Sequence, residues 1–289
     1  MSAKVTDAGQ SDAGPLSPRQ DSMRISCVIP TRDRIQMVQR AIASVLAQER
    51  PCDEIVVVDD GSVDGTADRL AARFPQLRLL RLSGVGPGRA RNAGVAIATG
   101  EILLFLDSDD EWTPDHVLRL LEQLTGEYAV AYGTARTLDL VSGGEFLIPD
   151  RGVGPTGACF DALLRWWFLV PSAMAVRRAA FDRVGGFVLN DLGEDWGLFL
   201  QLAQHYPFGF AGPEPITVRY LHEGSQCRLH NRQTIFAAVS ALHQLGWEAG
   251  WHSAATARFS ELLSWLNQKD DPWTTVHEWY LSMKRENLV

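Results

Sequence analysis

The stretch that decides the fold is Ile102-Leu103-Leu104-Phe105-Leu106, which runs directly into Asp107-Ser108-Asp109-Asp110-Glu111-Trp112. Five consecutive apolar residues bounded by polar ones predict a buried strand. Four of the next five residues carry carboxylates, and charges of one sign this close together repel one another. A divalent cation held by oxygen ligands would relieve the repulsion, so we expect Asp107 and Asp109 to share one ion. A solvated acidic turn is the alternative, but ligands of open α/β sheets collect at strand ends.

Strand-like and helix-like segments alternate through the first part of the chain. Three strands are predicted before Ile102: a short β-rich run at residues 25–29, a continuously apolar run at 55–58, and a third strand at 77–82. Helical patterns separate them, at residues 37–46, 66–74 and 89–99. Because the two kinds of segment alternate, we expect an α/β fold in which a Rossmann-like, mainly parallel sheet is flanked by helices.

The pattern becomes less regular after Leu124. Helices are predicted at residues 114–124, 178–184 and 194–204, and strands at 129–134, 172–176 and 215–220. Residues 138–159 are rich in glycine and are expected to be an irregular region near a site. From Gln233 onward the pattern is helical and contains several tryptophans, which predicts a C-terminal helical extension.

The composition argues against several classes of protein. A net charge of −8 provides no electrostatic footprint for nucleic acid or for an anionic membrane surface. The four cysteines are scattered without C-x-x-C spacing, which argues against a zinc site and a disulfide framework and favours the reducing cytoplasm. No segment approaches the roughly 18 apolar residues of a membrane span. Residues 1–22 lack an apolar signal core and are expected to form a disordered tail.

The segment Gly84-Val85-Gly86-Pro87-Gly88 does not fit a dinucleotide-binding fingerprint. The third glycine of G-x-G-x-x-G would fall on Arg89 or Arg91, and the segment follows the third predicted strand rather than the first. Backbone N–H groups at the following helix start can still face an anion, and the two arginines would add positive charge there. The alternative is that both arginines are solvated surface residues.

Acidic pairs occur at two further places. Asp59-Asp60 follows the second predicted strand, where carboxylates can accept hydrogen bonds from ribose hydroxyls or from a base N–H. The next residue, Gly61, also favours a turn, and both interpretations can hold together. Glu194-Asp195 opens a predicted helix, where the macrodipole alone favours negative charge. His222 lies in a polar loop after a strand, as either a structural or solvated residue or a metal ligand.

Considered together, these motifs resemble those of family 2 glycosyltransferases, which are inverting enzymes of the GT-A fold. The resemblance rests on five segments in this order: Pro30-Thr31-Arg32-Asp33, Val57-Val58-Asp59-Asp60-Gly61-Ser62, Gly88-Arg89-Ala90-Arg91-Asn92-Ala93-Gly94, Gly100-Glu101 and Leu106-Asp107-Ser108-Asp109-Asp110-Glu111-Trp112. It is close over residues 24–125 and looser through Val184-Gly185-Gly186-Phe187 and Gly193-Glu194-Asp195-Trp196 to Tyr220-Leu221-His222.

The resemblance implies roles for the matching residues. A nucleoside site is implied at Pro30, Thr31, Arg32, Asp33 and Asp60, with Asp59 adjacent. Arg89 or Arg91 would approach the uracil or the diphosphate. The D-x-D segment Asp107-Ser108-Asp109 would contact the sugar nucleotide and hold Mg²⁺ or Mn²⁺, with His222 as a further metal ligand. Asp195 would be the catalytic base.

The implied activity is the inverting transfer of a sugar from a nucleotide-diphosphate sugar, most simply a UDP-sugar, to an acceptor hydroxyl. The acceptor would be a saccharide or glycolipid in bacterial polysaccharide or glycolipid synthesis, in the cytoplasm or at the inner face of the membrane. Processive relatives carry Q-x-x-R-W after the E-D pair, but here Arg165-Trp166 precedes that pair and Ala162 stands in place of the glutamine. We therefore expect a single-transfer, non-processive enzyme.

These assignments divide the chain into a tail (1–22), a nucleotide-sugar-binding half (23–125), an acceptor-binding and catalytic half (126–232) and a helical extension (233–289).

Two other functions remain open. A non-catalytic module would bind the sugar nucleotide without transferring the sugar. A phosphatase also uses D-x-D after a strand, but Glu111 stands where Thr or Val is expected, and no matching lysine is evident.

Overall fold

The computed structural model describes residues 23–189, 193–225, 232–251 and 253–268. Within these residues, nine strands form one sheet. Its first part is parallel and has the order β3-β2-β1-β4. The bounds are Ile25–Thr31 for β1, Glu54–Asp59 for β2, Arg78–Arg81 for β3 and Ile102–Phe105 for β4. The predicted alternation of strand and helix, and the α/β class, are confirmed.

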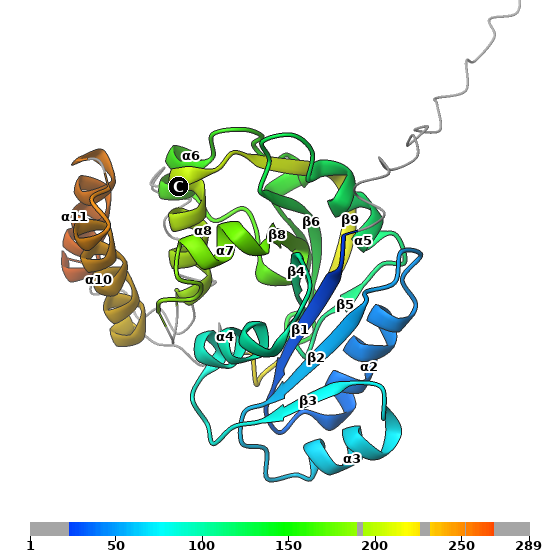
Figure 1. The fold of residues 1–289 in the computed structure, drawn as a ribbon. Helices are drawn as coiled ribbons and strands as arrows, with labels where there is room; N and C mark the ends of the chain where they lie inside the picture. Colours follow the sequence, from blue (N-terminus) through cyan, green and yellow to red (C-terminus); the bar gives the residue numbers. More distant parts are fainter. Residues whose placement is uncertain (1–22, 190–192, 226–231, 252, 269–289) are drawn as a thin grey trace, which may run out of the picture.

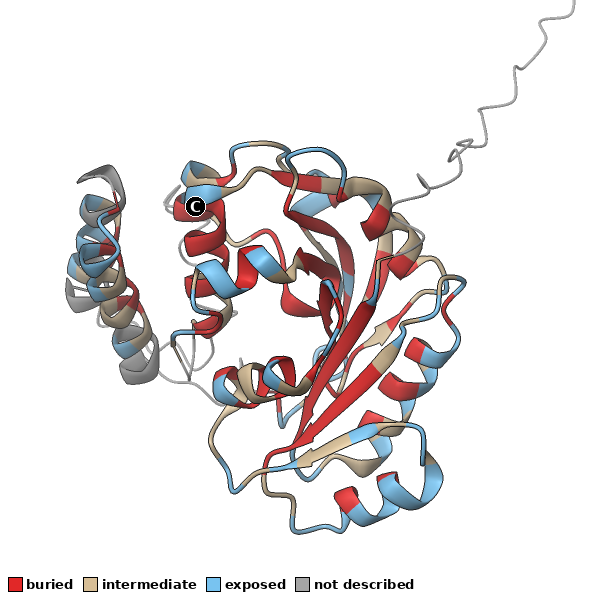
Figure 2. Cartoon of the chain, in the orientation of Figure 1, coloured by how far each residue is buried: buried red, intermediate tan, exposed pale blue. Residues whose placement is uncertain are grey.

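Helices cover both faces of this parallel part (Figure 1). α2 (Ile35–Leu46) and α3 (Thr66–Arg73) lie on one face, and α4 (Pro87–Ile97) lies on the other. Two apolar clusters result, one on each face, so every residue of β1 and β4 is buried (Figure 2). A strand buried on both faces is mostly apolar, which is why the apolar residues of these strands predicted them correctly.

α4 packs unusually close to the sheet. A Cβ atom on Gly94 would lie 2.5 Å from Val28 Cγ1 and 2.9 Å from Val58 Cγ2, so only glycine fits there. The helix starts at Pro87, two residues earlier than predicted, because proline is well suited to the first helical position. The close packing places the start of α4 beside the carboxyl ends of the strands.

The second part of the sheet is mixed in direction. β4 pairs antiparallel with β8 (Met174–Arg177), and the sheet continues through β6 (Val130–Asp139), β9 (Phe208–Leu221) and β5 (Glu111–Trp112). The α-helices of this part are α5 (His116–Gln123), α6 (Phe160–Arg165), α7 (Arg178–Arg183) and α8 (Glu194–His205). Single 3₁₀ turns, η1 and η2, occur at Asp150–Gly152 and Pro171–Ala173.

The prediction of an irregular region at residues 138–159 was wrong in part. β6 continues to Asp139, and β7 (Glu145–Ile148) folds back antiparallel onto it through a turn at Gly143 and Gly144. β9 is also longer than predicted, because its first residues pair with β6. Both differences have one cause: the pairing partner, rather than local periodicity, extends these strands.

The C-terminal helices α10 (Arg232–Glu248) and α11 (Ser253–Gln268) pack against each other and stand beside α6 and α8 (Figure 1). Phe259 of α11 packs against Trp196 of α8, with ring centroids 5.6 Å apart. The predicted helical extension is therefore present as far as Gln268. The predicted tail, 1–22, and residues 269–289 lie outside the described residues. Among the described helices, none is both long enough and apolar enough to cross a membrane.

Candidate active site

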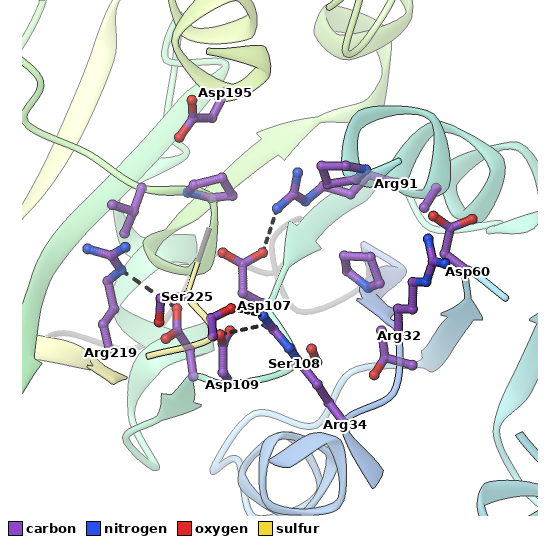
Figure 3. Close-up of a pocket in the computed structure, with 18 of the residues that line it drawn as sticks. Arg32, Arg34, Asp60, Arg91, Asp107, Ser108, Asp109, Asp195, Arg219 and Ser225 are labelled. Atoms are coloured by element: carbon purple, nitrogen blue, oxygen red, sulfur yellow. Dashed lines mark hydrogen bonds and ion pairs between the residues drawn. The ribbon is translucent and has the colours of Figure 1, made fainter. Parts of the chain in front are cut away.

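A cavity of about 430 Å³ lies at the carboxyl ends of β1, β2 and β4. Its walls also include the start of α4, the start of α8 and the end of β9, so both parts of the sheet contribute (Figure 3). Ten of the residues singled out from the sequence line it: Pro30, Thr31, Arg32, Asp33, Asp60, Arg91, Asp107, Ser108, Asp109 and Asp195. Asp59 is buried nearby, Arg89 is exposed on α4, and His222 contacts the side chain of Asp109.

Asp60 holds the glycine-rich loop that follows β3. Its Oδ1 accepts hydrogen bonds from the backbone N–H of Val85 at 2.7 Å and of Gly84 at 3.2 Å, and its Oδ2 accepts one from Gly86 at 2.8 Å. The loop does face an anion, as its glycines suggested, but in this structure that anion is the carboxylate of Asp60. Asp60 therefore shapes the cavity wall.

Asp33 and Asp59 also hold loops in place. Asp33 has a φ of 50°, and its Oδ1 accepts hydrogen bonds from the backbone N–H of Val63 at 2.7 Å and of Asp64 at 3.2 Å. Asp59 Oδ1 accepts a hydrogen bond from Ser62 N–H at 2.8 Å. These bonds tie the loop after β1 to the loop after β2.

Two side chains on the same wall have polar groups without close partners among the described residues. Thr31 Oγ1 is buried and has no hydrogen-bond partner among the described residues. The Arg32 side chain is 61% exposed, and its closest carboxylate contact is 3.9 Å long, to Asp33. An unpaired buried hydroxyl is costly, and a ligand in the cavity would supply the missing partner.

Two arginines and a histidine surround the D-x-D segment. Arg91 Nη2 donates to Asp107 Oδ1 at 2.6 Å, and Arg34 Nη1 donates to Asp109 Oδ2 at 2.7 Å. His222 Nε2 lies 3.1 Å from the same oxygen of Asp109. The repulsion that suggested a metal ion is thus relieved by side chains of the protein in this structure. Arg34 was not singled out from the sequence, although it directly follows the Pro30–Asp33 motif.

The neighbouring carboxyls have different protonation tendencies. Burial opposes ionisation of Asp109, but the hydrogen bond from His222 and the charge of Arg34 outweigh it and lower the pKa of Asp109. The pKa of Asp110 is raised, mainly because this side chain is buried. Ser172 Oγ donates to Asp110 Oδ2 at 2.6 Å. Asp109, which favours the ionised form, therefore lies beside Asp110, which favours the protonated form.

Arg91 connects the two acidic motifs. Its side chain is only 5% exposed, and besides Asp107 it bonds Glu194 Oε1 through Nη1 at 2.9 Å. Arg91 is therefore not a solvated surface residue, whereas Arg89 is exposed. Burial, together with the charge of Asp195, raises the pKa of Glu194 to about 8 despite the opposing charge of Arg91. Because α4 and α8 both begin at the cavity, one guanidinium can reach both motifs.

Asp195 lies in the first turn of α8 and lines the cavity. Its Oδ1 accepts a hydrogen bond from Trp196 N–H at 2.7 Å. Burial raises the pKa of Asp195, although that hydrogen bond and the charge of Arg91 oppose the rise. A half-buried carboxylate with a raised pKa is a suitable general base.

The carboxylates of Asp107 and Asp109 are the candidate ligands for a metal ion in the cavity. The described residues contain no group of three or more His, Cys, Asp and Glu side chains able to hold an ion. Arg91 occupies only one oxygen of Asp107, and Asp107 Oδ2 has no hydrogen-bond partner among the described residues. Mg²⁺ commonly binds through one or two carboxylates and completes its shell with water and substrate phosphate. Asp107 and Asp109 fit such a substrate-dependent site.

Comparison with known sequences identifies similar proteins. The family model described as Glycosyl transferase family 2 matches residues 26–185. An uncharacterized glycosyltransferase of Nostoc sp. is 34% identical over 231 residues, which cover 76% of this chain and 69% of that protein. The succinoglycan biosynthesis protein ExoO of Rhizobium meliloti is 41% identical over 120 residues, which cover 41% of this chain but only 34% of that protein.

Solved structures share the fold at low sequence identity. TarS 1–349 of S. aureus in complex with UDP-GlcNAc has a TM-score of 0.66 at 18% identity, over 84% of this chain and 71% of that chain. The mannosyltransferase PcManGT of Pyrobaculum calidifontis, in complex with GDP-Man and Mn²⁺, has a TM-score of 0.59 at 19% identity, over 96% and 91% of the two chains. These structures have the GT-A fold, which is therefore the fold of this chain.

Proposed function

The chain belongs to glycosyl transferase family 2, and we propose that it moves a sugar from a nucleotide-diphosphate sugar to an acceptor hydroxyl with inversion. The observation that carries this proposal is that one cavity holds both Asp107 and Asp195, with Arg91 bonded to Asp107 and to the neighbour of Asp195. Donor-binding and proton-accepting groups must meet in this way for a direct displacement, because the donor and the acceptor react in one step.

The donor would lie along the strand ends, with its nucleoside against the wall of Thr31, Arg32 and Asp60. The unpaired hydroxyl of Thr31 supports this placement. The GT-A structures solved with UDP-GlcNAc and with GDP-Man support a nucleotide-sugar donor. We propose a UDP-sugar as the donor. The diphosphate would then reach Asp107 and Asp109.

A divalent ion, Mg²⁺ or Mn²⁺, would be held by Asp107 and Asp109 together with the donor diphosphate, with His222 near enough to assist. Bound there, it would neutralise the negative charge of the diphosphate. The Mn²⁺ bound to PcManGT supports this inference. Arg91 pairs with Asp107 and orients it, and Arg34 does the same for Asp109.

Asp195 would accept the proton of the acceptor hydroxyl. As the O–H bond breaks, the hydroxyl oxygen forms a bond to the anomeric carbon, and the bond from that carbon to the diphosphate oxygen breaks on the opposite side. Attack from the opposite side inverts the configuration. The raised pKa of Asp195 supports this role, because a base works best when its pKa approaches the working pH.

The acceptor would be a saccharide or glycolipid, and the enzyme would make single transfers in polysaccharide or glycolipid synthesis. Similar proteins named for succinoglycan biosynthesis support this inference. The absence of Q-x-x-R-W after Glu194-Asp195 supports single transfers. A glycolipid acceptor would bring the enzyme to the inner face of the membrane.

A donor panel tests the proposal. The protein is mixed with UDP-, GDP-, CDP- and dTDP-sugars, with and without Mn²⁺, and melting temperature and release of nucleoside diphosphate are measured. One donor at a hundred times its dissociation constant should stabilise the fold by about 2.7 kcal/mol. If no nucleotide sugar stabilises the protein or is cleaved, the proposed function is wrong.

Metal dependence is tested with EDTA and with Asp109→Asn. The amide keeps an oxygen for Arg34 and His222 but removes the charge that would bind the ion, so the fold should survive. Donor affinity measured by calorimetry should fall by about tenfold or more, since a charged ligand is lost. Unchanged donor binding and turnover of the unaltered protein in EDTA would remove the metal from the proposal.

A further inference from the structure

The cavity carries a cationic side chain that is not part of the proposed donor site. Arg219, near the end of β9, lines the cavity with its side chain 16% exposed. Figure 3 shows Arg32 and Asp60 on one side of Asp107, and Arg219 and Asp195 on the other. Arg219 therefore faces the region of Asp195 rather than the wall that would hold the nucleoside.

The guanidinium of Arg219 has few partners for its five N–H groups. Nε is buried and has no hydrogen-bond partner among the described residues. Its distance to Asp110 Oδ2 is 3.8 Å, too long for a hydrogen bond, and Nη1 lies 3.5 Å from Thr137 Oγ1. A planar guanidinium whose N–H groups have few partners is suited to a carboxylate or phosphate that binds two of those N–H groups at once.

Asp110 does not form a close, hydrogen-bonded ion pair with Arg219. The oxygens of Asp110 already accept hydrogen bonds from Ser172 Oγ at 2.6 Å and from Tyr220 N–H at 3.4 Å. Because these oxygens are already hydrogen-bonded and Arg219 Nε lies 3.8 Å from Asp110 Oδ2, Arg219 keeps N–H groups for a ligand at the cavity wall.

Trp167 lines the same cavity. Its ring is half-buried and packs against the small apolar cluster that contains Ala135, Val170 and Ala173. Its Nε1–H is buried and has no hydrogen-bond partner among the described residues. Aromatic rings pack well against the C–H groups of a sugar, and the indole N–H can donate to a hydroxyl.

We propose that Trp167 and Arg219 form the acceptor subsite, and that the acceptor is an anionic saccharide whose carboxylate or phosphate binds Arg219. The proposal rests on the function proposed above and adds the chemical class of the acceptor to it. A sugar ring would pack on Trp167, its anionic group would pair with Arg219, and one of its hydroxyls would face Asp195.

Saturation-transfer NMR with three matched glycosides tests this subsite: methyl β-D-glucoside, methyl β-D-glucuronide and the 6-phosphate of methyl β-D-glucoside. They differ only at position 6, and samples are measured with and without UDP and Mn²⁺. At least one anionic glycoside should bind about tenfold more tightly than the neutral one, and the two anionic probes tell carboxylate from phosphate. Arg219→Gln should reduce the preference to about twofold or less, and Arg219→Lys should retain part of it.

Controls separate this proposal from its alternatives. Arg73→Gln removes the same charge from the exposed end of α3 and should leave all affinities unchanged. Melting curves show whether each variant folds. If Arg219→Gln does not fold, the glycoside preference is compared between Arg219→Lys and the unaltered protein. Equal binding of all three glycosides, or binding of none, overturns the proposal. So does a loss of UDP affinity in Arg219→Gln with its glycoside preference intact, which would assign Arg219 to the donor. Failure of the unaltered protein to bind UDP would instead count against the proposed function.

Discussion

Single side chains link the two halves of the candidate site. Arg91 is the clearest case, because it is buried and bonds both Asp107 and Glu194. Removing one partner of a buried ion pair costs about 3–5 kcal/mol, since the other charge is left uncompensated. A substitution of Arg91 would therefore lower both stability and turnover, so the loss of turnover could not be assigned to catalysis. Substitutions of Asp195 and Glu194 are more informative.

Asp195→Asn separates catalysis from a structural role at the helix start. The amide keeps an oxygen for the Trp196 N–H but cannot accept a proton from the acceptor, so turnover should fall by ~10²–10⁴-fold. Donor affinity and melting temperature should barely change. Glu194→Gln is the matched control and should affect turnover much less. Near-normal transfer by Asp195→Asn would remove Asp195 from the mechanism.

Glu194 should also make stability depend on pH. Its pKa is about 8 in the folded protein, against an ordinary value of 4.5, so between these values the folded state keeps a proton that the unfolded chain releases. The free energy of unfolding contributed by this group is therefore greatest below pH 4.5 and is lost as pH rises through 8. Glu194→Gln does not titrate, so its melting temperature relative to wild type should rise across this range. A difference of about 1 kcal/mol corresponds to about 2–4 °C.

Thermal melts of both proteins from pH 5 to 9 measure this trend. Glu127→Gln is the control, because Glu127 is exposed, and its melting difference should show no comparable trend. A constant difference between Glu194→Gln and wild type at every pH would show that Glu194 titrates normally.

At the scale of elements, the close contact between α4 and the sheet sets the position of Arg91. Gly94→Ala would push α4 away from Val28 and Val58, and overpacking of this kind costs about 1–3 kcal/mol. Helix propensity alone predicts the opposite, a gain of about 1 kcal/mol. Urea unfolding should show a net loss of stability, and the shift of α4 should also reduce turnover.

Ala96 is the comparison within the same helix. It is exposed, so Ala96→Gly should cost about 1 kcal/mol through helix propensity and leave turnover unchanged. Stabilisation by Gly94→Ala would contradict the close packing.

At the scale of the whole molecule, the pair of helices α10 and α11, the C-terminal hairpin, supports the helix that carries Asp195. A Cβ atom on Gly193, just before α8, would lie 3.6 Å from Ala238 Cβ and from Leu242 Cδ1 of α10. Leu242 is fully buried, so Leu242→Ala should cost about 2–5 kcal/mol. Loosening the start of α8 should lower turnover, whereas donor affinity should be kept because the residues proposed to bind the donor lie on the other half of the sheet.

Trp247 lies on the same helix with 72% of its surface exposed. Trp247→Ala should therefore leave melting temperature and turnover unchanged, and both variants can be compared by thermal melts and by the donor-release assay. Equal turnover in Leu242→Ala and wild type would show that the hairpin does not position α8.

The parallel half of the molecule was determined by its sequence. Its central strands β1, β2 and β4 are buried along nearly all of their length and are mostly apolar, so the acidic residues after Phe105 must lie at the sheet edge. Residues within a few positions of a strand end reach the cavity wherever the rest of the chain goes. That is why Thr31, Asp60 and Asp107 were found from the sequence, and why the order of motifs indicated the family.

Which side chains meet across the cavity depends on how distant segments pack together. β6 and β7 pair through contacts that local periodicity does not contain, and Trp167 and Arg219 reach the cavity from segments that lie far apart in the sequence. The exposure of Arg89 and the burial of Arg91, two residues later, follow from the face of α4 that packs on the sheet. Hydrogen bonds and ion pairs depend on distances of a few ångströms between such segments, and a sequence pattern specifies the elements but not those distances.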